Sequence, residues 1–396
     1  MKKNLIYLFA LLCAMSLLTA CSDDDEKVVC PLEQTAFTAD NGLTLTYNGE
    51  AMPGKKVTFM PSATDPTQAT LYLSGNLDLS SALTKESAAL PAGAGVFPGS
   101  PVVTLPVTLD IQGDACTFSG NGETDYCTFA YAGRATASSL SLDLTDVTLK
   151  NATLAGTKWV PTPLNDDYTE EPIHLIWESG KGVEIMPGWE LPTQSVLLIA
   201  LRLGLIDAGA EEKVSAEDML CNVLRDITLG ADGNISASYI DAANGGTSVV
   251  QTPAHVAQYV VLNDRQLKVY LNLEAILANA QRLAASTKAV DLGDLIAKAM
   301  QALLPLVTDG VPLEYTKADG KMTVYLNTDL LLPLLKSIVA PLFMDEEFVA
   351  QLIELMKSNP DFGSMAGMAE GMLKSLPEII NTTTKVEIGL NLTAAE

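Results

Sequence analysis

Few residues of this chain have the types and spacing that catalysis needs. The sequence has only two histidines, and no Ser or Cys stands in a nucleophile motif such as G-x-S-x-G. His174 lies in an alternating strand pattern and His255 lies close to Pro253, so we interpret each as a core or surface residue. We therefore expect a protein that is not an enzyme.

An acidic stretch at Asp166-Asp167 and Glu170-Glu171 is the other place where catalysis could occur. Paired carboxylates can hydrolyse glycosides without histidine, and carboxylates can also hold calcium. The stretch is bounded by prolines, however, and it lacks EF-hand spacing. We interpret it as a solvated loop and expect neither a cofactor nor a metal ion.

The cysteines are chemically distinctive because disulfides persist in oxidising compartments. Cys116 and Cys127 flank Asn121-Gly122, and Asn-Gly is a strong signal for a two-residue hairpin. A turn at this dipeptide places Cys116 directly opposite Cys127, at a separation that a disulfide tolerates. We therefore expect this bridge, with two cysteines packed as small apolar residues as the alternative. Cys30 and Cys221 remain, and they could pair only if the amino-terminal segment reaches the second half of the chain.

The amino terminus has the layout of a secretory signal. Lys2 and Lys3 precede an apolar run over residues 5–18, which is shorter than the roughly 20 residues of a membrane-spanning helix. Leu18-Thr19-Ala20-Cys21 resembles the bacterial lipobox. This resemblance implies that residues 1–20 are removed as a signal peptide and that Cys21 is lipidated, which would attach the mature chain to a membrane.

An acidic run, Ser22-Asp23-Asp24-Asp25-Glu26, follows Cys21. It resembles the export signal of Bacteroidetes surface lipoproteins, which implies an outer-membrane protein exposed on the cell surface. Residues 21–35 also fit a solvated tether, because like charges repel and keep a chain extended. The two interpretations are compatible, and they leave open whether the protein faces the periplasm or the cell surface.

The charge of the chain excludes one class of partner. The formal net charge is −24, and it becomes −26 when Lys2 and Lys3 leave with the signal peptide. A field of this sign repels phosphate backbones, so we expect no nucleic-acid partner. With 48% hydrophobic residues the chain can build one or two cores, and its length suits two domains.

The pattern of apolar residues predicts an α+β protein with a domain boundary near residue 152. Residues 36–151 alternate with period two between turn residues, as in Leu140, Leu142, Leu144 and Val147. This pattern predicts an antiparallel β-sandwich or barrel. Residues 152–396 mix strand and helix patterns, which predicts a second antiparallel β domain with inserted apolar helices.

The second domain opens with Gly156-Thr157-Lys158-Trp159. A Gly followed closely by a Trp at the start of a β region resembles the calycin (lipocalin-like) proteins, and the resemblance implies a Trp that closes one end of a β-barrel. Here two residues separate the Gly from the Trp, whereas lipocalins usually have one. A Trp that simply packs in the core of the second domain is the alternative, and it predicts nearly the same burial.

A repeat with an offset of 55 residues lies in the second domain. Val269-Tyr270-Leu271-Asn272 and Val324-Tyr325-Leu326-Asn327 each end a predicted hairpin, and each runs into an apolar helical pattern. Asn is a good helix cap because its side-chain oxygen accepts an early backbone N–H. Two copies are too few for a solenoid, so we expect one sheet with helices inserted between its hairpins.

The predicted helices of the second domain carry more apolar surface than one stripe needs. Residues 330–343 are apolar nearly all round, and residues 345–358 have one apolar face. The helices could bury one another, or they could enclose a cavity or groove for an apolar ligand. For the second case we predict five lining residues: Trp177, Trp189, Met365, Met368 and Met372.

The whole chain resembles a family of Bacteroidetes outer-membrane lipoproteins without an assigned activity, which implies location and architecture and no site. From these features we predict a lipid-anchored envelope protein that binds an apolar small molecule or lipid in its second domain. The alternative is a surface interaction or adhesion module that binds protein or glycan through its first domain.

Overall fold

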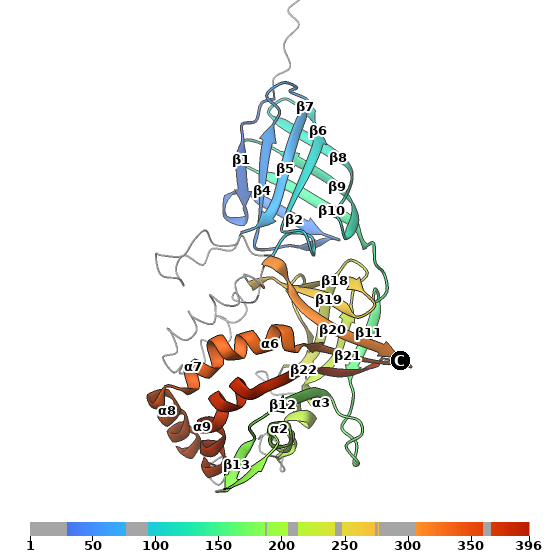
Figure 1. Cartoon of the computed structure of the whole chain (residues 1–396). Coiled ribbons are helices and arrows are strands. Elements are labelled where there is room, and N and C mark those ends of the chain that lie inside the picture. Colours follow the sequence, from blue (N-terminus) through green and yellow to red (C-terminus); the bar gives the residue numbers. More distant parts are fainter. Residues whose placement is uncertain are drawn as a thin grey trace, which may run out of the picture.

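The computed structural model of the chain describes residues 30–76, 94–186, 188–204, 213–241, 248–273, 276, 306, 308–358 and 366–395. Strands dominate, and the helices gather in the carboxy-terminal part. Figure 1 shows a β domain stacked on a second β domain, from which α6 to α9 project to one side. Cys21 and Met365 lie outside the described residues.

The first domain consists of two sheets. The smaller contains β1 (Thr35–Thr38), β4 (Lys55–Pro61), β5 (Gln68–Gly75) and β6 (Val102–Thr108), in that order. The larger contains β3 (Glu50–Ala51), β2 (Leu43–Tyr47), β10 (Leu140–Leu149), β9 (Cys127–Ala135), β8 (Ala115–Glu123) and β7 (Asp110–Gln112). Their pairs are antiparallel except β2 with β10, which is parallel, so the prediction of a wholly antiparallel domain is wrong at this pair.

The core of the first domain follows the predicted alternation. Leu140, Leu142 and Leu144 of β10 are fully buried, and Val147 is nearly so. Large side chains from both sheets, among them Phe59 and Leu71, fill the space between the sheets. Burial of this apolar surface is what holds the two sheets together.

The β8–β9 hairpin does not turn at Asn121-Gly122. Gly120 lies opposite Tyr131, and Gly122 lies opposite Phe129. A Cβ at Gly122 would stand 2.5 Å from the Phe129 ring, so the glycines make room for rings on the neighbouring strand. The turn lies instead at residues 124–126, where Thr124 N donates to Cys127 O.

This register makes the prediction of a Cys116–Cys127 bridge wrong. Cys116 lies opposite Ala135, at the far end of the hairpin from Cys127. Eight residues of strand separate Ala135 from Cys127, about 26 Å at the usual rise. The four described cysteines, including these two, are free thiols.

The second domain contains a closed antiparallel barrel. Eight strands pair in a ring in which β22 returns to β11, with Val160 opposite Thr393. The ring consists of β11 (Thr157–Pro161), β15 (Leu224–Leu229), β16 (Asn234–Ile240), β18 (Ala257–Asn263), β19 (Gln266–Leu271), β20 (Val311–Ala318), β21 (Lys321–Leu326) and β22 (Thr383–Ala394). Closure removes the sheet edges that would otherwise invite pairing with other chains.

Two further strands pair with the barrel, and two others form a separate hairpin. β12 (Ile173–Ser179) pairs with residues 383–390, the first part of β22, and β17 (Val249–Gln251) pairs with β16. β13 (Val183–Met186) and β14 (Trp189–Leu191) form a separate hairpin.

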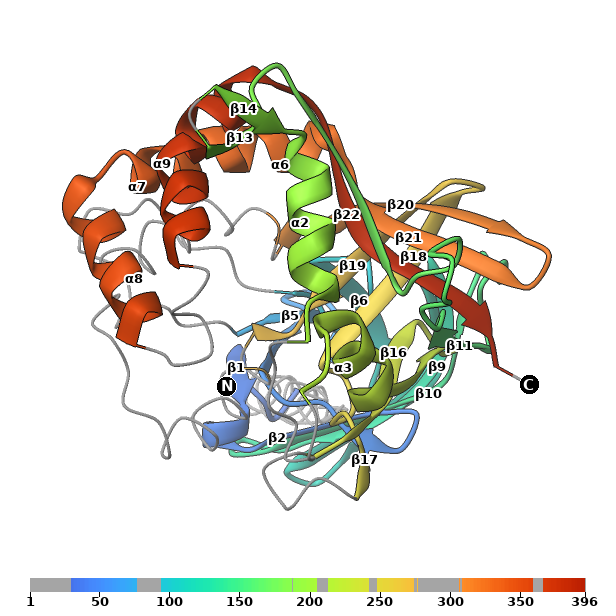
Figure 2. The ribbon, with the colours of Figure 1, turned by 90° about the horizontal axis from the view of Figure 1, so that it is seen from below.

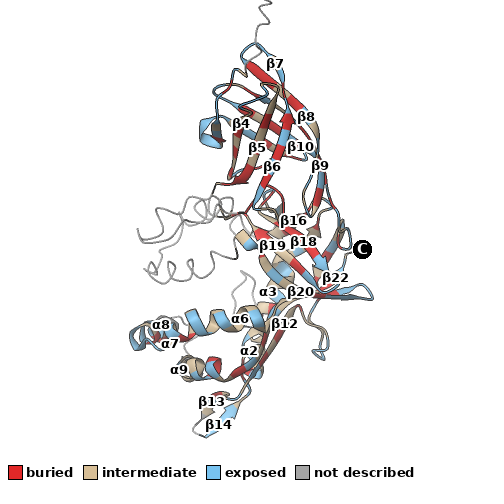
Figure 3. Ribbon diagram, turned by 45° about the horizontal axis from the view of Figure 1, so that its top comes forward, coloured by how far each residue is buried: buried red, intermediate tan, exposed pale blue. Residues whose placement is uncertain are grey.

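Trp159 is buried in the first strand of the barrel, as predicted. Its Nε1 donates to Thr157 Oγ1 at 2.8 Å, and Lys317 Nζ lies 5.7 Å from its ring centroid. Trp159 belongs to a continuous hydrophobic core that also includes the core residues of the first domain. The two domains are therefore packed as one hydrophobic unit (Figure 3).

Polar contacts also join the domains. The Tyr47 hydroxyl donates to the Asp232 carbonyl at 2.6 Å, and Asn151 Nδ2 donates to the Val261 carbonyl at 3.2 Å. The chain passes from the first pair of sheets to the barrel between β10 and β11.

The repeat forms two adjacent hairpins of the barrel, β18–β19 and β20–β21. Asn327 caps α6 as predicted, because its Oδ1 accepts from Leu330 N. At Asn272 one helical hydrogen bond, from Ile276 N, is described, and residues 277–305 lie outside the described residues.

Helices cover one side of the second domain (Figure 2). Ser215 caps α3, since its Oγ accepts from Asp218 N. Pro333 lies inside α6, and a π-helical segment follows it. The described helices are α2 (Thr193–Arg202), α3 (Ala216–Val223), α6 (Thr328–Leu334), η3 (Leu335–Val339), α7 (Ala340–Phe343), α8 (Glu346–Ser358) and α9 (Ala366–Thr382).

Candidate functional site

A second hydrophobic core lies beneath the helices. It joins Trp177 of β12 and Val386 of β22 to α2, α7 and α9, with Ile379 and Ile380 of α9 fully buried. Trp177 Nε1 donates to Thr383 Oγ1 at 2.9 Å. Trp177 is thus a satisfied core residue, and the helices bury one another on this side.

The predicted lining residues do not gather at one place. Met372 packs against the second core beside Trp177, whereas Trp189, on β14, is 52% exposed. Met368 belongs to α9, but its side chain is outside the described part of the structure, as is the whole of Met365. The described members of the set therefore do not line one cavity.

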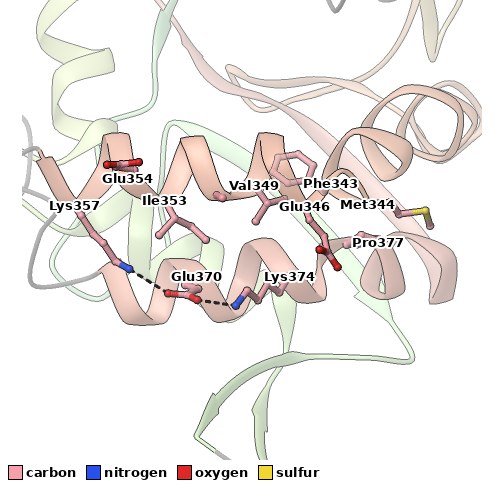
Figure 4. Close-up of a pocket in the computed structure, with 11 residues that line it drawn as sticks. Phe343, Met344, Glu346, Val349, Ile353, Glu354, Lys357, Glu370, Lys374 and Pro377 are labelled. Carbon is pink, nitrogen blue, oxygen red and sulfur yellow. Dashed lines mark hydrogen bonds and ion pairs between the residues drawn. The ribbon is translucent and has the colours of Figure 1, made fainter.

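A groove lies instead between α7, α8 and α9. Local sequence fixes the entry to α8, because Asp345 Oδ1 accepts from Glu347 N at 3.0 Å and from Phe348 N at 3.2 Å. Side-chain acceptors of this kind satisfy backbone N–H groups that the first helical turn leaves free. α8 and α9 then run side by side (Figure 4).

The groove has a volume of about 920 Å³. This falls within the range of about 300–1,000 Å³ that is usual for small-molecule sites. Val349 and Ile353 of α8 form a buried apolar floor together with Phe343, whose ring meets that of Phe348 edge to face at 5.7 Å. Met344, at one end of the groove, is 59% exposed.

Charged side chains form the rim of the groove. Glu370 of α9 pairs with Lys374 at 2.7 Å and with Lys357 of α8 at 3.5 Å (Figure 4). The hydrogen bond from Lys374 holds the pKa of Glu370 below its usual value. Two lysines thus share one carboxylate, and because an ammonium has three donors, both can also donate to a ligand. Glu346 and Glu354 also line the groove, so its carboxylates outnumber its lysines. The groove suits a molecule with an apolar body and a polar head that Lys357 and Lys374 can reach.

Sequence reasoning found part of this groove. The apolar face predicted for residues 345–358 includes Val349 and Ile353, which form the floor. The rim was not predicted. Nothing in the sequence distinguishes Lys357, Glu370 and Lys374 from other residues on a helix surface, and only the packing of α8 on α9 brings them together.

A polar network crosses the outer face of the barrel at Gly389. His174 Nε2 lies 2.9 Å from Glu387 Oε2, and the His174 ring meets the Tyr325 ring at 4.9 Å. Tyr325 in turn donates to Glu314 at 3.0 Å. Gly389 lies opposite both His174 and Tyr325, and its lack of a side chain allows their rings to meet.

The network affects the acidity of two of its members. Burial, together with the hydrogen bond to Glu314, raises the pKa of Tyr325 to about 12. Burial opposes ionisation of Glu387, but hydrogen bonds from His174 and Lys385 outweigh it and hold the pKa of Glu387 below its usual value. These contacts tie β12, β22, β21 and β20 together, which fits the structural role expected for His174.

His255 lies between the domains and is 3% exposed. Its Nδ1 contacts Asn234 Oδ1 at 2.9 Å, and its ring meets Tyr47 at 5.1 Å. Burial lowers its pKa. His255 is therefore a neutral core residue at the domain interface, as the sequence suggested.

A buried ion network holds the acidic loop to the helices. Arg202 of α2 pairs with Glu171 and, through its Nε at 3.2 Å, with Glu217 of α3. Its guanidinium also lies 4.5 Å from the Tyr168 ring centroid. The predicted solvated loop is thus anchored at Glu171.

A shallower hollow of about 460 Å³ lies on the first domain, over the β8–β9 hairpin. Its lining is mostly polar and includes Asn121, Thr128 and Asp146, with Phe129 as the aromatic member. Such a surface is suited to hydrogen-bonding ligands.

Within the described ranges, no cluster of three or more His, Cys, Asp or Glu side chains could hold a metal ion. Among the helices that the structure describes, none is both long and apolar enough to cross a membrane.

No family of proteins, no curated protein and no solved structure matches the chain.

Proposed function

We propose that this protein is a lipid-anchored envelope protein that binds an amphiphile, without catalysis, in the groove between α7, α8 and α9. The observation that carries the proposal is the pairing of a buried apolar floor at Val349 and Ile353 with a lysine-bearing rim at Lys357 and Lys374. An apolar chain gains free energy by leaving water for the floor, at about 0.8 kcal/mol per buried methylene. A polar head that accepts hydrogen bonds from Lys357 or Lys374 gains charge-assisted hydrogen bonds at the rim.

The proposed location rests on the amino-terminal sequence. Lipidation at Cys21 would hold the protein at an envelope membrane, and the acidic residues that follow would favour the outer membrane with the protein facing outward. An amphiphile-binding protein in this position has lipids and other envelope amphiphiles within reach.

The barrel of the second domain supports a calycin-like assignment, which we also propose. Its eight strands close into an antiparallel ring, and Trp159 is buried in the first of them. The helices that form the groove are inserted between β21 and β22 of this ring. The proposed ligand therefore binds outside the barrel, on an addition to it.

A matched pair of variants tests the groove. Ala350 lines the groove and Gln351 does not, although both are exposed on α8. Ala350→Trp should fill the groove and reduce the affinity for a long-chain fatty acid, used as the probe, at least tenfold. Gln351→Trp should leave the affinity unchanged. Equal affinities in the two variants, or no binding by the natural chain, would contradict the proposal.

A second candidate function is favoured by the hollow on the first domain. Asn121, Thr128 and Asp146 offer hydrogen-bonding groups at this hollow, an arrangement suited to a glycan or a protein loop. Asp146→Ala should weaken retention on a glycan array if this hollow binds sugar, and it should leave fatty-acid binding intact.

A further inference from the structure

The start of the described chain is fixed to the first domain. Leu32 is 5% exposed and belongs to the main core, and Cys30 packs against the same core. Cys116, the second residue of β8, is fully buried in that core. Two cysteines distant in sequence thus belong to the same core.

Within this core the two side chains are neighbours, and burial, followed by the influence of Cys30, raises the pKa of Cys116 to about 11. The other two described cysteines have different neighbours. Cys127 lies opposite Leu149, and Cys221 Sγ contacts the Thr162 carbonyl at 3.8 Å. Cys30 and Cys116 are therefore the pair that the fold brings together.

We propose that Cys30 and Cys116 form a disulfide in the exported protein. The oxidant would be a protein or small-molecule disulfide of the oxidising compartment. The Cys30 thiolate, the more exposed of the two, attacks the oxidant and forms a mixed disulfide with release of one thiol. Cys116 then loses its proton and attacks the Cys30 sulfur, which releases the second thiol. Two protein thiols are oxidised, and one oxidant disulfide is reduced to two thiols.

The bridge would determine how the protein stands on its anchor. Cys116 lies near the β7–β8 turn, at the end of the first domain remote from the second domain (Figure 1). Eight residues, 22–29, separate Cys21 from Cys30, and the nine Cα–Cα steps reach at most about 31 Å when extended. The first domain would then lie next to the membrane and the groove would face away from it. This consequence rests on the proposed lipidation, whereas the bridge requires only export.

Peptide mapping of the exported full chain tests the bridge. Free thiols are alkylated in denaturant without reduction, and the protein is cleaved after acidic residues, because Glu123 and Asp125 separate Cys116 from Cys127. We expect a linked peptide pair that contains Cys30 and Cys116 and disappears on reduction. Alkylation of Cys30 should fall at least tenfold relative to a reduced sample.

Matched variants complete the test. Cys221→Ala should retain the linked pair, and Cys30→Ala should make Cys116 fully alkylatable in denaturant. Recovery of Cys30 and Cys116 as free thiols from the exported chain, or of Cys30 linked to a different cysteine, would overturn the proposal. Fatty-acid binding is measured separately, so failure of the bridge and failure of the groove are distinguishable.

Discussion

Gly389→Ala should strongly destabilise the second domain, because Gly389 lies in β22, the strand that pairs with three other strands. β22 pairs with β11, β12 and β21. A Cβ at Gly389 would lie 2.0 Å from the Val324 carbonyl oxygen and 2.6 Å from the Tyr325 Cα. Both are backbone atoms of the paired strand, so rotation of a side chain cannot relieve the overlap.

The expected cost follows from this geometry. Overpacking usually costs about 1–3 kcal/mol, and an overlap with backbone atoms belongs at the upper end, about 3 kcal/mol. For a domain of this size, that lowers the melting temperature by roughly 6–12 °C. The measurement is thermal unfolding followed by circular dichroism, with urea unfolding as a second measure of the free energy.

Gly180→Ala is the control for this experiment. A Cβ at Gly180 would make only ordinary contacts, the nearest at 3.5 Å from Thr382 Cβ, so we expect a change within about 0.5 kcal/mol. If the two variants have the same melting temperature, the close approach of β22 to β21 at Gly389 is incorrect. The argument that Gly389 allows the rings of His174 and Tyr325 to meet then fails as well.

Two further predictions concern His255 and Asn327. Burial lowers the pKa of His255 in the folded protein, so its contribution to stability is full above the unfolded value of about 6.5 and is lost as the pH falls below it. His255→Gln should flatten the fall in unfolding free energy between pH 7 and pH 5, and an unchanged slope would contradict this. Asn327→Ala removes the cap of α6 and a hydrogen bond to Glu314. The free energy of unfolding, measured in urea, should fall by about 1–2 kcal/mol. Asp329→Ala, in the first turn of the same helix, is the control and should have a smaller effect.

Much of the fold could be predicted because local signals and burial agree. The alternation in Leu140, Leu142 and Leu144 predicted the inner face of β10, and Asn327 predicted the start of a helix. In each case the residue that favours the structure locally is also the one that the tertiary packing needs.

The hairpin at Asn121-Gly122 could not be predicted correctly because tertiary packing overrides its turn propensity. Gly122 and Gly120 face the rings of Phe129 and Tyr131, and this need for space is invisible without knowledge of the register. Because the turn was placed wrongly, Cys116 was predicted to lie opposite Cys127. The proximity of Cys30 to Cys116 was not predicted, since it depends on where the amino-terminal segment packs against the core.

The groove was only partly predictable for a similar reason. The apolar face of α8 follows from periodicity, so Val349 and Ile353 were expected to be buried. The place of Trp177 in the second core could not be predicted, because it depends on the partner of its indole N–H, Thr383. Nothing local to β12 encodes that partner, which lies more than two hundred residues later in the chain.

Native mass spectrometry of the mature protein, purified from its own cell envelope, tests the groove proposal most directly. The account predicts a co-purifying amphiphile at one molecule per chain, recovered by lipid extraction, retained by Gln351→Trp and lost from Ala350→Trp. A natural chain that is free of ligand and also fails to take up a fatty acid on titration would contradict it.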